Sequence, residues 1–235
     1  MPRPPLGTLG KATVVLLLAW IAGFVDGVGY LLILGIYSSH MTGNTAALGR
    51  DLDLARWRSV LEHGWPVAAF VLGLLVGAAI TEAARRAQFH SRLALVLGLE
   101  LVLLALLLAY LPGVDASPAW LGLPALAMGM QTVTVTRVGD QRVYSTYITG
   151  SLAKFAEALT GYLFSRQRRL LGHAALTGGL WLLFLAGGLT GAAAEVRWRV
   201  GAFWWPLAAL AGLVALDLRR PIAPVAADEP LGFSA

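Results

Sequence analysis

The chain alternates between long apolar segments and short polar loops. Six segments approach or exceed the roughly 20 residues that a helix needs to cross a hydrocarbon core of about 30 Å. These segments cover residues 12–36, 64–84, 93–111, 118–137, 174–194 and 200–218. The pattern predicts an all-α, polytopic membrane protein with six transmembrane helices.

Two further segments, 42–55 and 149–165, are shorter or more polar than these six. Both contain charged side chains, namely Arg50, Asp51 and Asp53 in the first and Lys154 and Glu157 in the second. We expect half-helices or interfacial helices here, and leave open that 149–165 forms a seventh span.

Composition agrees with a membrane protein. Hydrophobic residues make up 57% of the 235 residues and charged residues 13%, whereas a soluble domain has about 25% charged residues. The chain has no cysteine, which excludes disulfides and cysteine–zinc sites. The net charge is +5, but the basic residues lie in short loops between apolar segments, so they indicate membrane topology and exclude nucleic acid as a partner.

The distribution of these basic residues predicts the orientation. Six spans with the N-terminus inside place about 13 basic residues in the cytoplasm and about 5 outside, so both termini should be cytoplasmic. Arg3 and Lys11 precede the first apolar segment as in a signal peptide, but five more spans follow, which favours an uncleaved first helix.

Two short phrases recur in the same order along the chain. Thr42-Gly43-Asn44 is followed by a GxxxG phrase at 73–77, and Thr149-Gly150-Ser151 by another at 187–191. Recurrence in order indicates a duplicated unit of three spans. Because an odd number of spans inverts the second unit, we expect an inverted repeat with a broken or half-helix after each TG motif.

The repeat divides the chain into four parts. Residues 1–11 form a cytoplasmic N-terminus, 12–111 the first three-span repeat and 112–218 the second repeat, and 219–235 a disordered cytoplasmic tail.

Asp26 lies more than halfway along the first span, among glycines. An ionised carboxylate in hydrocarbon costs about 3 kcal/mol or more, so it must face a partner, a wet cavity or the interior of the bundle. A cation or proton site is one explanation. A structural carboxylate that accepts hydrogen bonds from nearby backbone donors is the other.

Residues around the two TG motifs are candidates for a substrate site. A helix that starts at such a motif presents free backbone N–H groups to an anion or polar molecule. A capped helix start at the interface is the simpler alternative. The predicted binding residues here are His40, Thr42, Gly43, Asn44, Thr149, Gly150 and Ser151.

Gln131 stands before the second TG motif roughly as Asp26 stands before the first. It either lines the same polar path or joins helices by hydrogen bonds, which is the commoner use of such residues. The four histidines have no metal-ligand spacing, and we expect neither a metal nor another cofactor.

Four blocks carry a resemblance to a known family. They are Gly23-Phe-Val-Asp26-Gly-Val-Gly, His40-Met-Thr-Gly-Asn44, Met128-Gly-Met-Gln131 and Tyr147-Ile-Thr-Gly-Ser151. Over roughly residues 12–218 the chain resembles the YoaK-like family of uncharacterised bacterial inner-membrane proteins. The resemblance implies a six-span protein of the bacterial inner membrane and no particular substrate. Ser151 stands where that family often has Asn, which weakens the equivalence of the two half-sites.

The leading function hypothesis is a secondary transporter of a small molecule or ion, in which Asp26 and Gln131 face the path. Its expected partners are the lipid bilayer and that substrate, with a homo-oligomer left open. A non-transporting scaffold or accessory subunit is the alternative. We expect no enzyme, because no nucleophile–base pair or metal set supports one.

Overall fold

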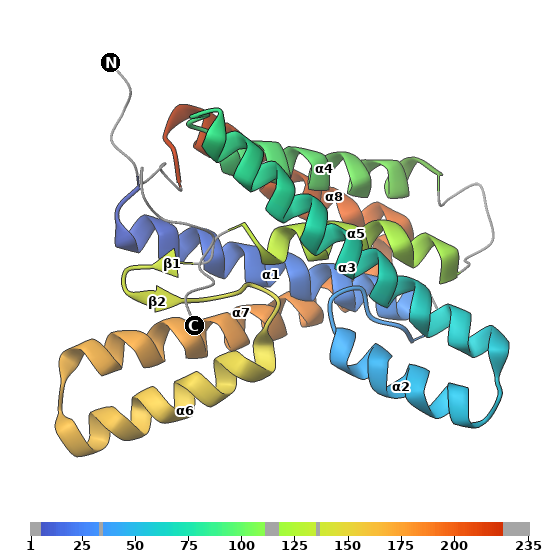
Figure 1. The fold of residues 1–235 in the computed structure, drawn as a ribbon, viewed down its shortest axis with the longest axis horizontal. Helices are drawn as coiled ribbons and strands as arrows, with labels where there is room; N and C mark the ends of the chain where they lie inside the picture. The colour runs from blue at the N-terminus through green and yellow to red at the C-terminus, as the bar shows by residue number, and fades with distance from the viewer. Residues whose placement is uncertain (1–5, 33–34, 111–117, 135–136, 223–235) are drawn as a thin grey trace.

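The computed structural model describes residues 6–32, 35–110, 118–134 and 137–222, which are mainly helical (Figure 1). Part of the predicted N-terminal segment 1–11 and most of the predicted tail 219–235 lie outside these residues. In chain order the elements are α1 (Thr8–Leu32), α2 (Met41–Asp53), α3 (Trp57–Arg86), α4 (Arg92–Tyr110), η2 (Pro118–Leu121), α5 (Gly122–Thr132), β1 (Arg137–Val138), β2 (Gln141–Arg142), α6 (Ile148–Ser165), α7 (Arg168–Trp198), η3 (Arg199–Phe203) and α8 (Trp204–Arg219).

Four helical stretches of the described chain are long and apolar enough to cross a membrane. Three are the helices α1, α3 and α4, and the fourth, Arg168–Arg219, contains both α7 and α8. Five of the six predicted spans therefore correspond to these stretches. The chain is an all-α polytopic membrane protein.

The predicted span 118–137 is longer than the helix that the structure shows there. Helical residues cover only η2 and α5, so the helix ends at Thr132, and a short antiparallel β1–β2 hairpin follows. Val133 and Thr134 are β-branched residues, which lose side-chain freedom in a helix and favour extended backbone. This local preference favours the end of the helix at Thr132, and α5, with 11 residues, is about half as long as a full span.

α1 runs through the centre of the molecule and packs along α7 (Figure 1). The two backbones approach so closely that a Cβ atom on Gly23 would lie 2.0 Å from the carbonyl oxygen of Phe184. A Cβ on Gly187 would lie 2.1 Å from the carbonyl oxygen of Trp20. Only glycine permits this approach, which explains the GxxxG phrase at 187–191.

α3 and α5 form a second close pair. A Cβ on Gly73 would lie 2.1 Å from the carbonyl oxygen of Leu126, and a Cβ on Gly129 would lie 2.2 Å from that of Phe70. The GxxxG phrase at 73–77 thus packs a helix of the first half of the chain against one of the second half.

The contacts of these two helix pairs occupy matching positions in the sequence. The contact residues of α1 and α5 are 106 positions apart, as in Gly23 and Gly129 or Trp20 and Leu126. Those of α3 and α7 are 114 positions apart, as in Phe70 and Phe184 or Gly73 and Gly187. α1 and α5 run in opposite directions in Figure 1.

The remaining helices are arranged around these two pairs. α2 folds back on α3, α6 folds back on α7, and the two helical hairpins extend toward different ends of the molecule (Figure 1). α4 packs against α8 and α5. The helices α2, with 13 residues, and α6, with 18 residues, form where the polar segments 42–55 and 149–165 predict short helices.

Candidate functional site

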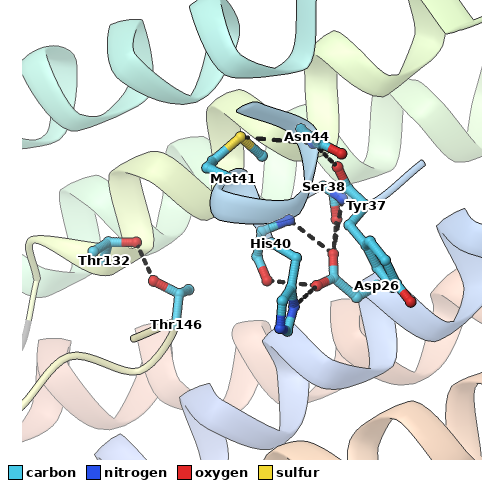
Figure 2. A network of polar contacts seen from close by, with 9 residues as sticks. Asp26, Tyr37, Ser38, His40, Met41, Asn44, Thr132 and Thr146 are labelled. Carbon is cyan, nitrogen blue, oxygen red and sulfur yellow. Dashed lines mark hydrogen bonds and ion pairs between the residues drawn. The ribbon is translucent and has the colours of Figure 1, made fainter. Parts of the chain in front are cut away.

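The Asp26 carboxylate is buried in α1 and accepts five hydrogen bonds from one short segment (Figure 2). The backbone N–H groups of Ser38 and Ser39 each donate to Oδ1 at 2.8 Å. The Ser38 hydroxyl donates to Oδ1 at 2.7 Å, and the Ser39 hydroxyl donates to Oδ2 at 2.6 Å. Nδ1 of His40 lies 3.2 Å from Oδ2. These donors compensate for removing a carboxylate from water.

The chain reverses direction after α1 to bring these donors back to Asp26. Gly35 has a positive φ of 77°, which glycine adopts without strain, and its N–H donates to the carbonyl of Tyr30. The Asn44 side chain then donates to the carbonyl of Tyr37 at 2.8 Å. The buried Asn44 therefore holds the returning segment in place from the first turn of α2.

His40 joins this buried cluster to an open hollow. Its side chain is 40% exposed, and its ring lies edge-on to Phe184 of α7 with 5.4 Å between ring centroids. The hollow has a volume of about 350 Å³. Its lining comes from α1, the returning segment and α7, and includes Asp26, Tyr30, Tyr37, His40, Phe184 and Gly188.

The proximity of Asp26 affects the titration of His40, which lies between α1 and α2 and outside the apolar stretches. The hydrogen bond to Asp26 raises the pKa of His40 above its usual value, burial opposes the shift, and the negative charge of Asp26 adds to it. The hollow therefore borders a carboxylate and an imidazole whose protonated form that carboxylate stabilises.

The TG motifs lie inside their helices and not before them. α2 begins at Met41, so Thr42 and Gly43 belong to its first turn, and the N-cap residue is His40, whose side chain makes no capping hydrogen bond. Similarly, α6 begins at Ile148, and Thr149, Gly150 and Ser151 follow within its first turn. The helices thus start one residue before the predicted segments 42–55 and 149–165, and the expectation of a helix after each motif is corrected by about one turn.

Gly150 has a specific packing role. A Cβ atom at this position would lie 1.8 Å from the ring of Tyr147, so the aromatic ring lies directly over the glycine. Ser151 is buried and donates its hydroxyl to the carbonyl of Tyr147 at 3.0 Å. By contrast, nothing comes within 4 Å of a Cβ placed on Gly43.

Gln131 belongs to a second buried polar cluster. Its Nε2 donates to the carbonyl of Leu18 in α1 and to the hydroxyl of Ser145, both at 3.0 Å. The hydroxyls of Thr132 and Thr146 lie 2.7 Å apart, as Figure 2 shows. This cluster joins the end of α5 to the segment before α6 and, through Gln131, to α1.

The two clusters correspond through the helix intervals. The α1–α5 interval relates Asp26 to Thr132, and the interval between the TG motifs relates Ser39 to Thr146. The Asp26–Ser39 bond thus has a neutral counterpart in the Thr132–Thr146 bond. Sequence reasoning matched Asp26 with Gln131, one position away, and did not include Ser38, Ser39, Ser145 or Thr146 in the site. The sequence signal for these residues is a pair of hydroxyl side chains before each motif, Ser38-Ser39 and Ser145-Thr146. The second residue of each pair stands three positions before the Thr of the TG dipeptide.

The two TG regions do not share the hollow. Among the predicted site residues, only Asp26 and His40 line it. A second, apolar hollow of about 250 Å³ lies between α6 and α7 and contains none of them. The described residues contain no group of three or more His, Cys, Asp or Glu side chains that could hold a metal ion.

The apolar helices and glycine-packed pairs define a polytopic helical membrane protein with a polar cluster at a break between helices. Residues 14–216 match the family described as protein of unknown function (DUF1275), and the chain belongs to this family. The UPF0700 transmembrane protein YoaK of Bacillus subtilis (strain 168) is 25% identical over 208 residues, which cover 87% of this chain and 92% of that protein. No solved structure is significantly similar to the chain.

Proposed function

We propose that the protein is a secondary transporter of a small molecule or ion, built from two inverted three-span repeats. The observation that carries this proposal is the Asp26–His40 pair beside an open hollow at the break between α1 and α2. A carboxylate within an apolar helix is costly, and such residues typically mark substrate, ion or proton paths.

The paired helices support the repeat. One interval relates α1 to α5 and another relates α3 to α7, and the same glycine-to-carbonyl contacts occur in both pairs. The glycine-rich helix of each half, α3 or α7, thus packs against the first helix of the other half. The opposite directions of α1 and α5 in Figure 1 favour inversion. Inverted repeats are typical of secondary transporters.

The chemistry of the hollow suggests how a substrate binds. Asp26 offers negative charge at the base of the hollow, and His40 stands beside it with two-fifths of its side chain exposed. A small cation, or a solute with a hydrogen-bond donor, can compete with His40 for the carboxylate. Protonation of His40 is then linked to binding, which is how proton coupling arises.

The proposal also includes the orientation and location of the chain. Both termini lie in the cytoplasm, and the protein resides in the bacterial inner membrane, as the excess of basic residues in the inner loops predicts. The transport function requires one chain and its substrate, and leaves a homo-oligomer open.

A ligand screen followed by a flux assay tests the function. The purified protein is heated with a library of small cations and metabolites, and a bound ligand raises the apparent melting temperature because it stabilises the folded state. Each hit is then added to proteoliposomes that contain a pH-sensitive dye and carry an imposed potassium diffusion potential. We expect uptake or a change of internal pH with the wild-type protein.

Two aspartate variants make this assay specific. Asp26→Asn should abolish flux and ligand-dependent stabilisation, whereas Asp53→Asn, at an exposed position in α2, should leave both unchanged. Equal flux in the wild-type and Asp26→Asn proteins would show that Asp26 does not serve transport.

One observation favours the alternative function, a membrane scaffold or accessory subunit. Of the two TG regions only the first contributes to the lining of the hollow, and the Asp26 carboxylate already accepts hydrogen bonds from its own chain. In that case Asp26 stabilises the fold only. The scaffold predicts no ligand in the thermal screen, no flux, and a large loss of stability in Asp26→Asn.

A further inference from the structure

Glu100 is a second carboxyl group inside the helix bundle, separate from the proposed substrate site. It lies near the middle of α4 and is 0% exposed. The residues on the same face of the helix are aliphatic, namely Leu93, Leu97, Leu104 and Leu107. Glu100 therefore interrupts an otherwise apolar packing surface.

This carboxyl has no polar partner in the described part of the chain. Neither Oε1 nor Oε2 of Glu100 accepts or donates a hydrogen bond there. Asp26 provides the contrast, since it is buried to a similar degree but accepts five hydrogen bonds. Hydrogen-bond donors stabilise an ionised carboxylate. Glu100 has none among the described residues, which favours its neutral, protonated form.

The elements packed against α4 bring no ion-pair partner to Glu100 within the described residues. α5 has no titratable residue, and η3 contributes Arg199, which pairs with Glu195. α8 contributes Asp217 and Arg219 near its end, α3 contributes Arg58, Glu62, His63, Glu82, Arg85 and Arg86 near its two ends, and α4 itself begins at Arg92.

Asp217 is the acidic group of α8 on the side of α4. It accepts a hydrogen bond from the N–H of Ala94 at 2.8 Å, six residues before Glu100. At 1.5 Å per residue, that contact is about 9 Å away along the helix axis. Charged groups of the neighbouring elements thus gather near the ends of the helices, away from the level of Glu100.

From this geometry we infer that Glu100 is a proton-binding site within the membrane, occupied by a proton in the conformation seen here. An ionised carboxylate without a partner in an apolar environment costs far more than a neutral carboxylic acid, and such groups take up a proton instead. Because Glu100 is 0% exposed and α4 packs on α5 and α8, the bound proton can exchange with water only when this packing opens. This inference goes beyond the proposed function, because it does not require that the protein transports a substrate.

Infrared spectroscopy of the full-length protein in lipid vesicles tests the protonation directly. A carboxylic acid without hydrogen bonds has a C=O stretching band at higher frequency than a hydrogen-bonded acid, and a carboxylate lacks this band. We expect the band at neutral pH in the wild-type protein and its complete loss in Glu100→Gln. Glu157→Gln removes an exposed acid of α6 and should leave the band unchanged.

Exchange into heavy water tests the access of the proton to solvent. The band should shift to lower frequency as deuterium replaces the proton. If Glu100→Gln fails to fold, Glu100→Met replaces the acid with an apolar side chain of similar length and provides the same comparison. Absence of the band at neutral pH, or a band that survives both substitutions, overturns the assignment. A band that never shifts in heavy water shows that the proton is trapped, and overturns the exchange.

Discussion

At the scale of single residues, Asp26 shows how a buried charge is accommodated in this protein. Its position in an apolar span is readable from the sequence, and so is its need for partners. The identity of those partners cannot be read from the sequence, because Ser38, Ser39 and His40 contact Asp26 only after the chain reverses at Gly35. The repeated hydroxyl pair before each TG motif is the one sequence feature that marks them.

The hydroxyl of Ser39 should contribute measurably to stability. It donates to Oδ2 of the buried Asp26 at 2.6 Å, and hydrogen bonds to charged groups contribute about 1.5–3 kcal/mol. Ser39→Ala should lower the free energy of unfolding by about that amount in denaturant titrations of the purified protein. Ser165→Ala removes an exposed hydroxyl of α6 and should change it by less than about 0.5 kcal/mol. An equal effect of the two substitutions contradicts the role of Ser39.

The His40–Asp26 pair should make stability depend on pH. Because the hydrogen bond to Asp26 raises the pKa of His40 in the folded state, the pair stabilises the fold fully below the unfolded value of about 6.5. This contribution is lost as the pH rises through the higher folded pKa. The difference in melting temperature between the wild-type protein and His40→Gln should therefore shrink as the pH rises above about 6.5. His90→Gln, at an exposed loop position, should show a constant difference, and a pH-independent difference for His40→Gln rejects the prediction.

At the scale of elements, hydrophobic length predicted α1, α3, α4, α7 and α8 well, and overestimated α5. Apolar content alone does not distinguish a helix from an extended segment. The β-branched residues after Gln131 favour extended backbone, and α5 ends at Thr132. The GxxxG phrases predicted close packing but not its partners. That α7 packs on α1, and α3 on α5, depends on the three-dimensional arrangement of the two halves.

Neighbouring glycines of α7 provide a sharp test of this packing. A Cβ on Gly187 would lie 2.1 Å from the carbonyl oxygen of Trp20, whereas a Cβ on Gly188 would lie 3.7 Å from that of Gly23, an ordinary contact. Gly187→Ala should therefore destabilise the protein by about 1–3 kcal/mol or more, since α1 and α7 must separate. Gly188→Ala should be neutral or stabilising by up to about 1 kcal/mol, because alanine favours helix. Unfolding in mixed micelles measures both, and similar values for the two variants contradict the α1–α7 contact.

At the scale of the whole molecule, the two halves of the chain are intertwined. The glycine-rich helix of each half packs on the first helix of the other, so neither half has a complete core alone. The recurring phrases in the sequence predict a duplication, but they do not predict that the glycine-rich helix of each half packs on the other half. The match at Gly23 and Gly129, or Phe70 and Phe184, becomes visible only when the contacts are known.

Inversion of the repeat makes a prediction about the membrane sides of equivalent connections. Arg56 stands between α2 and α3, and Gln167 stands between α6 and α7, so they occupy corresponding loops of the two halves. In an inverted repeat these loops lie on opposite sides, and the distribution of basic residues predicts Arg56 outside and Gln167 in the cytoplasm. Because the chain has no cysteine, Arg56→Cys and Gln167→Cys each introduce a single thiol. A membrane-impermeant maleimide should label Arg56→Cys in intact cells and Gln167→Cys only after permeabilisation, with no labelling of the wild-type protein. Labelling of both variants from the same side means that the halves are parallel, and the inverted arrangement proposed for transport must then be abandoned.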